Sequence, residues 1–164
     1  MQLTGLLDVL RGNAAYRELL ARLQTDATSE SFSVLRAARP FVLAALAQDW
    51  RGAVIYVTAR VDQAYNVAEQ LPVWLGERRV LRFAEPAPLF YERAPWGESA
   101  IRSRIETLAA LMPPGDVQVD PQPPVIVTSA RALMKRTLPV NQFRKASMLL
   151  KVRERHALDE TRFP

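Results

Sequence analysis

Two short apolar stretches decide the fold: AVIYVT at residues 53–58 and VIVT at residues 125–128. Both are continuous runs rich in β-branched side chains, which is typical of strands buried on both faces of a parallel sheet. Segments with helical spacing lie between and around them. Strands that alternate with helices predict right-handed crossovers and a three-layer α/β domain, in which helices cover both faces of a mostly parallel sheet.

Helices are expected on both sides of these strands. From residue 61 to residue 75 apolar side chains recur every three or four positions, and Gly76 is expected to end that helix. Residues 98–112 form a second helix, with Ile101 and Ile105 on its apolar side. Capping residues and spacing predict further helices over residues 3–10, 16–23, 40–50 and 130–136.

Shorter strands and two loops complete the expected order. The additional strands cover residues 32–35, 79–83 and 147–152. The loop at residues 85–97 holds three prolines, and we expect Phe90 and Tyr91 to pack against the helix that follows. The proline-rich stretch at residues 113–124 is expected to be a surface linker.

Composition excludes several classes of protein. The chain has 164 residues, 49% of them hydrophobic and 24% charged, which is the balance of a soluble globular domain. Its longest apolar run, Phe41 to Ala47, is too short to span a bilayer, so we expect no membrane contact and a cytoplasmic location. Because the chain has no cysteine and a single histidine, His156, we expect neither a metal site nor a catalytic triad.

Positive charge is concentrated near the end of the chain. Between residues 131 and 155 there are eight Lys or Arg against one acid, so this quarter carries +7 and the remainder −2. A basic face of this kind either binds phosphate or an acidic partner, or is a solvated surface that keeps the protein soluble. Arg131, Lys135 and Arg136 are its candidate contact residues.

The loop before the helix at residues 40–50 occupies the position where an open α/β sheet binds phosphate. It reads VLRAARP at residues 34–40 and has no glycine, lysine or hydroxyl side chain, all of which a working P-loop needs. Its residues Arg36, Ala37, Ala38 and Arg39 therefore read as a degenerate nucleotide-site loop. The two arginines remain candidates for binding an anion, or are exposed charges. No pair of carboxylates in an apolar setting and no other catalytic constellation is apparent.

Five segments resemble the N-terminal, UvrB-like module of the bacterial transcription-repair coupling factor, Mfd. They are AARPFVLAAL at 37–46, AVIYVT at 53–58, VLRFAEPAPLFYERAP at 80–95, SRIETLAAL at 103–111 and VIVTSARALMKR at 125–136. The similarity extends over residues 3–152, and its most specific piece is LFYERAP at 89–95, where the family commonly has proline in place of Phe90. UvrB itself carries a true P-loop and a long aromatic hairpin, and this chain has neither.

The resemblance implies a degenerate P-loop NTPase domain, helicase-like in fold, over residues 1–147. Residues 148–164 would then begin a second small domain that contacts UvrA. The chain would be a non-catalytic scaffold module in transcription-coupled nucleotide excision repair, recruiting UvrA-containing machinery to stalled RNA polymerase. Tyr91, Glu92 and Arg93 are candidate partner residues. No cofactor is expected here, because ATP, magnesium, RNA polymerase and DNA would be bound by motor domains outside this sequence.

Two other functions compete with this interpretation. A helicase-like ATPase would need Arg36 or Arg39 to replace the P-loop lysine, although a guanidinium does not act as a compact point charge. A direct nucleic-acid-binding domain would use the basic C-terminal quarter, together with exposed aromatic rings for stacking.

Overall fold

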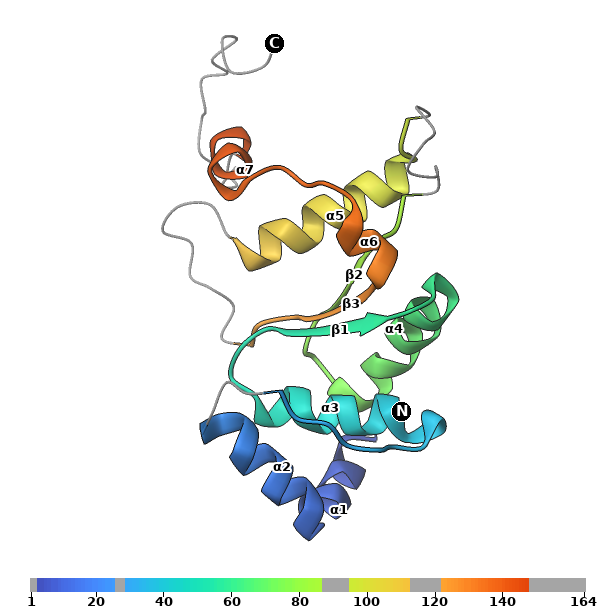
Figure 1. The fold of residues 1–164 in the computed structure, drawn as a ribbon, viewed down its shortest axis with the longest axis vertical. Helices are drawn as coiled ribbons and strands as arrows, with labels where there is room; N and C mark the ends of the chain where they lie inside the picture. Colours follow the sequence, from blue (N-terminus) through green and yellow to red (C-terminus); the bar gives the residue numbers. More distant parts are fainter. Residues whose placement is uncertain (1–2, 26–28, 87–94, 113–121, 148–164) are drawn as a thin grey trace.

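A three-stranded parallel sheet lies at the centre of the computed structural model, which describes residues 3–25, 29–86, 95–112 and 122–147 (Figure 1). Its strands are β1 (Val54–Thr58), β2 (Val80–Phe83) and β3 (Val125–Ser129), in the spatial order β1-β3-β2. Val125 stands opposite both Val54 and Val80, and every residue of β3 is buried. The predicted α/β class, its parallel sheet and the full burial of VIVT are confirmed.

Helices lie on both sides of this sheet (Figure 1). One face is covered by α3 (Arg39–Asp49) and α4 (Val61–Leu75), and the larger core, with Leu71 and Val127, lies between them and the strands. On the other face α5 (Glu98–Leu111) packs over β2 around Phe83 and Ile126. The short helices α1 (Leu7–Arg11) and α2 (Ala14–Thr25) form an outer layer beyond α3, and α6 (Ala130–Met134) and α7 (Val140–Ala146) follow β3.

Local stop and start signals act as the sequence predicts. Gly76 ends α4 with a φ of 63°, a backbone conformation that favours glycine. Pro40 lies in the first turn of α3, where its missing N–H costs no helical hydrogen bond. The Ser129 hydroxyl accepts from the amide of Ala132 at 3.2 Å and caps α6.

The strand expected at residues 32–35 is wrong, because this segment has no ladder partner and lies outside the sheet. A cavity lined by Phe32 and Val34 on one side and by Tyr56 and Val57 on the other separates it from β1. Val42 and Leu43 of α3 also line that cavity. This segment therefore faces β1 across the cavity and does not pair with it.

The prediction that residues 53–58 are buried on both faces is also wrong. Ile55 is 53% exposed and Val57 is 46% exposed, whereas Tyr56 between them packs against the core. Within the described sheet β1 is an edge strand, and α5 packs over β2 at the opposite edge. A continuous apolar run therefore does not distinguish a central strand from an edge strand.

The buried side of α5 differs from the one expected. Ile101 and Ile105 are exposed, and Arg104 and Thr107 are the buried residues. The Ser103 hydroxyl donates to the carbonyl of Arg82, and the Thr107 hydroxyl donates to that of Ser103 at 2.9 Å, so the polar side of this helix faces the edge strand β2. The i, i+4 spacing of Glu98 and Arg102 predicts a surface ion pair, and it is present at 2.9 Å. Glu106 instead pairs with Arg79 at 3.5 Å.

Several predictions lie outside the described residues. They concern the loop with Phe90, Tyr91, Glu92 and Arg93, most of the linker at residues 113–124, and the second domain at residues 148–164. Ser147, the first residue of the last expected strand, is described and is not in a strand. The helix α7 was not predicted. Among the described residues, the helices are too short or too polar to cross a bilayer.

Candidate functional site

Residues 36–39, which the sequence predicts to be a degenerate nucleotide-site loop, form a hydrogen-bonded turn. Residues Arg36–Ala38 form a 3₁₀ turn, η2, that leads directly into α3. The amide of Ala38 donates to the carbonyl of Leu35 at 2.9 Å, and the amide of Arg39 donates to that of Arg36. Pro40 has no amide hydrogen. The backbone donors of Ala38 and Arg39, which would have to wrap a phosphate, are therefore used within the turn.

A polar cavity of about 390 Å³ opens beside this turn. It lies between the start of α3, the middle of β1 and one face of α4. Four α4 residues line it, and because they lie three or four positions apart they share a face of the helix: Gln63, Asn66, Val67 and Gln70. The side chains that give the cavity its chemistry are Arg36, Arg39, Tyr56, Gln63, Asn66 and Gln70.

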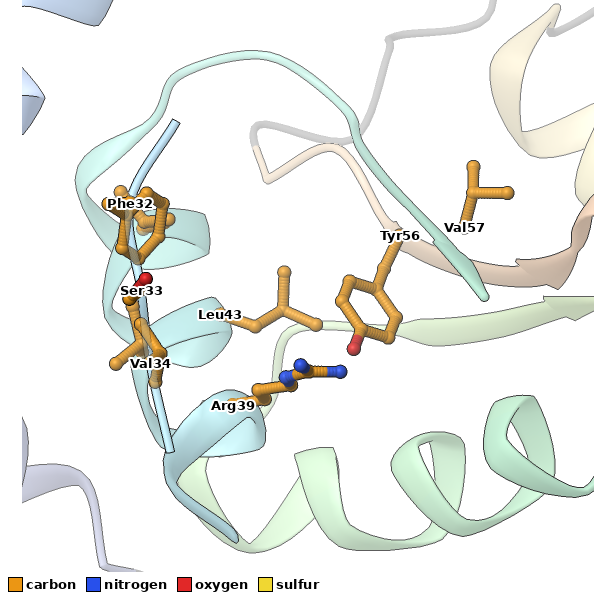
Figure 2. A pocket seen from close by; sticks show the side chains of 9 residues that line it. Phe32, Ser33, Val34, Arg39, Leu43, Tyr56 and Val57 are labelled. Carbon is orange, nitrogen blue, oxygen red and sulfur yellow. The ribbon is translucent and has the colours of Figure 1, made fainter. Parts of the chain in front are cut away.

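A second cavity, of about 560 Å³, adjoins the first (Figure 2). Apolar side chains from the segment before η2, from α3 and from β1 line most of it, among them Phe32, Val34 and Leu43. Arg39 and Tyr56 line both cavities. Figure 2 shows the Arg39 guanidinium pointing toward the Tyr56 hydroxyl, so these two side chains stand between the apolar and polar spaces.

The two arginines at this site have no acidic partner among the described residues. Within the described part of the chain, no carboxylate lies within 4.0 Å of the guanidinium of Arg36 or Arg39. Other arginines among the described residues form ion pairs, for example Arg60 with Asp62 at 3.0 Å. The turn therefore presents two uncompensated cations to solvent.

The expected basic surface is divided by the structure. Arg131 contacts Glu85 at 3.2 Å, and Ser129 donates to the same carboxylate at 2.7 Å. The Glu85 side chain is only 11% exposed, so this pair neutralises Arg131 locally. Lys135 is half-buried, and Arg136 is exposed. Glu85 was not among the predicted site residues, although an acid two residues after a strand lies at the edge of the sheet where such pairs form.

Arg104 fixes the carboxyl ends of the strands. Its side chain is buried at 3% exposure and donates to the carbonyls of Ala84 and Ala132, both at 3.1 Å, and of Lys135 at 3.3 Å. Its guanidinium lies 3.9 Å from the ring centre of Phe83 and 5.1 Å from that of Trp96. Burial lowers the pKa of Arg104. Its contacts join β2, α5 and α6.

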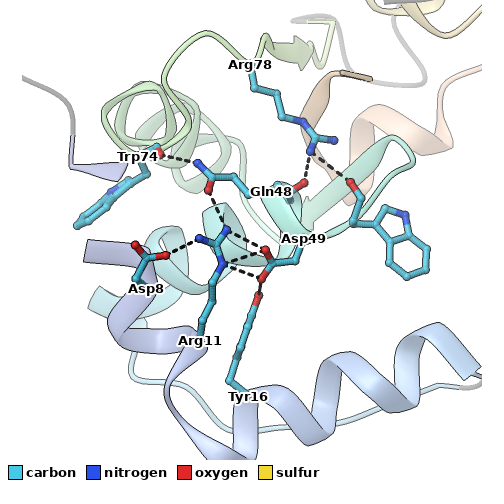
Figure 3. Close-up of polar contacts among 9 residues, drawn as sticks. Asp8, Arg11, Tyr16, Gln48, Asp49, Trp74 and Arg78 are labelled. Carbon is cyan, nitrogen blue, oxygen red and sulfur yellow. Dashed lines mark hydrogen bonds and ion pairs between the residues drawn. The ribbon is translucent and has the colours of Figure 1, made fainter. Parts of the chain in front are cut away.

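A polar cluster attaches the N-terminal helices to α3 (Figure 3). Arg11 bridges Asp8 at 2.7 Å and Asp49 at 2.8 Å, and the Tyr16 hydroxyl donates to Asp49 at 2.8 Å. These carboxylates raise the pKa of Arg11, and burial followed by the bond to Asp49 raises that of Tyr16. Since all of these groups bond to one another, the cluster is a structural clasp.

The other arrangement shown in Figure 3 is Arg78, a second buried arginine. It donates to main-chain carbonyls at the end of α3, including Ala47, and to Gly52 and Pro123. The described residues contain no group of three or more histidine or carboxylate side chains that could hold a metal ion. Tyr91, Glu92 and Arg93 lie outside them.

No protein-family model, curated protein or solved structure matches this chain. The assignment of the site therefore rests on the geometry of η2, α3, β1 and α4 and on the chemistry of the side chains that they bring together. Of the predicted loop residues, Arg36, Ala37 and Arg39 line the polar cavity. Gln63, Asn66 and Gln70 were missed, because their spacing places them on one face of α4 but does not show that this face lies beside Arg39.

Proposed function

We propose that this chain is a non-catalytic binding and scaffold module of a transcription-coupled nucleotide excision repair factor, built on a degenerate P-loop NTPase domain. One observation carries the non-catalytic part of the proposal. In the turn at residues 36–39 the amides of Ala38 and Arg39 donate to the carbonyls of Leu35 and Arg36, where a phosphate-binding loop would leave them free.

The repair role is supported by sequence resemblance and by consistency of the architecture. The segments that resemble the Mfd module include AVIYVT and VIVT, and these form the parallel strands β1 and β3. The turn precedes a helix that packs against the sheet, as a nucleotide loop would, although the segment before the turn is not a strand of that sheet. The module would serve UvrA recruitment at stalled RNA polymerase, with UvrA contacted mainly through sequence beyond residue 164.

The alternative functions have weaker support. An ATPase would need a side chain to do the work of both the missing lysine and the missing amides, and Arg39 instead points toward Tyr56 (Figure 2). A nucleic-acid surface on the C-terminal quarter loses part of its charge, because Arg131 pairs with Glu85. Both alternatives nevertheless predict binding that can be measured.

Calorimetric titration of the chain with ATP and magnesium tests the proposal. We expect no saturable heat, and a P-loop ATPase titrated in the same buffer serves as the positive control. A micromolar dissociation constant would refute the non-catalytic assignment. Filter binding of single-stranded DNA at two salt concentrations tests the nucleic-acid alternative, because phosphate contacts give a steep salt dependence.

A further inference from the structure

We propose that the two adjoining cavities beside Arg39 bind an acidic peptide segment of a protein partner. A carboxylate of the peptide would occupy the polar cavity, and a large apolar side chain next to it in sequence would occupy the apolar cavity. This inference rests on the proposed function, because an intact nucleotide site would place a phosphate at the same turn.

The charge of the site selects an anion. Arg36 and Arg39 have no carboxylate partner among the described residues, and none of the side chains lining the polar cavity is acidic. Two guanidinium groups offer paired donors that match a carboxylate in a fork arrangement. Because both side chains are exposed, they are accessible to a partner without rearrangement of the core.

The neutral side chains of the polar cavity suit a peptide better than a phosphate group. Gln63, Asn66 and Gln70 each present both a donor and an acceptor. A peptide has N–H and C=O groups that satisfy both kinds, whereas a phosphodiester offers acceptors only. The closed turn also supplies no free amides at Ala38 or Arg39 for a phosphate. The set of donors and acceptors therefore fits main-chain amides beside a carboxylate.

The apolar cavity adds an anchor for a hydrophobic side chain. Its volume of about 560 Å³ lies within the range of ligand-binding pockets. Phe32, which lines it, is 50% exposed, so this ring has apolar surface that an incoming side chain would cover. A buried aromatic or aliphatic anchor is the usual source of binding energy at protein interfaces.

The shared walls fix the spacing of the two peptide groups. Since Arg39 and Tyr56 line both cavities, a side chain in one and a side chain in the other belong to neighbouring residues of a bound chain. The Tyr56 hydroxyl, which makes no hydrogen bond to a described residue, stands at the boundary and is available to the ligand. The recognised motif is therefore an aromatic or aliphatic residue followed closely by Asp or Glu.

Fluorescence anisotropy with the complete chain tests this motif. The probe is a fluorescein-labelled nonapeptide with Trp-Glu-Glu at its centre and Gly-Ser flanks, compared with the same peptide carrying Trp-Gln-Gln or Gly-Glu-Glu. We expect Trp-Glu-Glu to bind at least about 10-fold more tightly than either. Arg39→Gln should weaken it by about 10-fold or more, whereas Arg144→Gln, on the distant α7, should leave it unchanged. Circular dichroism checks that both variants fold.

The outcomes separate this inference from the proposed function. Equal binding of the three peptides, or full binding by Arg39→Gln, would overturn the inference. Binding of an oligothymidylate that is lost in Arg39→Gln, with no peptide binding, would replace it by a nucleic-acid site. If ATP with magnesium binds at micromolar concentration and displaces the peptide, the turn is a nucleotide site. This outcome would refute both the proposed function and the inference that rests on it. If neither ATP nor the acidic peptide binds, only the peptide site is refuted.

Discussion

Replacing Arg104 by lysine keeps a positive charge but should destabilise the fold strongly. The guanidinium donates to the carbonyls of Ala84, Ala132 and Lys135 and lies over the ring of Phe83 at 3.9 Å. A shorter ammonium has neither the planar fork nor a flat surface for stacking. No carboxylate partner among the described residues would hold the lysine charge in place.

The expected loss follows from these contacts. Losing at least one hydrogen bond from a charged donor costs about 1.5–3 kcal/mol. Weakening a desolvated cation–π contact costs about 1 kcal/mol more. We therefore expect the free energy of unfolding to fall by about 3 kcal/mol. With a urea m-value of about 2 kcal/mol/M, the midpoint of unfolding should move down by about 1.5 M.

Equilibrium urea unfolding followed by far-UV circular dichroism measures this change. Arg102→Lys is the matched control, because Arg102 lies on the same helix, is largely exposed and forms only a surface pair with Glu98. Its effect should stay within about 0.5 kcal/mol. If Arg104→Lys were as mild as this control, the site would be open to water, and the argument from three buried carbonyl acceptors would be refuted.

Two further predictions concern the clasp and the sheet. Burial and the bond to Asp49 raise the pKa of Tyr16, so its neutral form stabilises the fold fully below its ordinary pKa of about 10, and this contribution is lost as pH rises above it. Tyr16→Phe should lower the free energy of unfolding by about 1–2 kcal/mol at pH 7 and make its decrease between pH 10 and pH 11 shallower. Urea unfolding at each pH measures both effects. An unchanged slope would contradict the raised pKa of Tyr16. Val127→Thr should cost about 2–3 kcal/mol because it buries a hydroxyl, whereas Val57→Thr at the exposed edge should cost less than about 1 kcal/mol. Equal costs in thermal unfolding would mean that β1 is covered in solution.

The chemistry of the candidate site was only half accessible from the sequence. The absence of glycine and lysine at residues 34–40 is a local property, so the sequence shows directly that this segment lacks the residues of a working P-loop. Its partners from α4 could not, because Gln63, Asn66 and Gln70 have no distinctive residue type and gain meaning only beside Arg39. The pairing of Arg131 with Glu85 could not be predicted either, because the two residues are far apart in the chain and follow different strands.

The sequence by itself determined the elements whose signals are local. Strands with β-branched runs, the glycine that ends α4 and the serine that caps α6 depend on backbone sterics and on hydrogen bonds within a few residues. Only the tertiary structure decided which faces became buried. The apolar Ile101 and Ile105 remain exposed while Arg104 is buried, because carbonyls and rings from β2, α6 and Trp96 converge there. Burial of a charge depends on acceptors supplied by residues far away in the chain, and no local pattern encodes them.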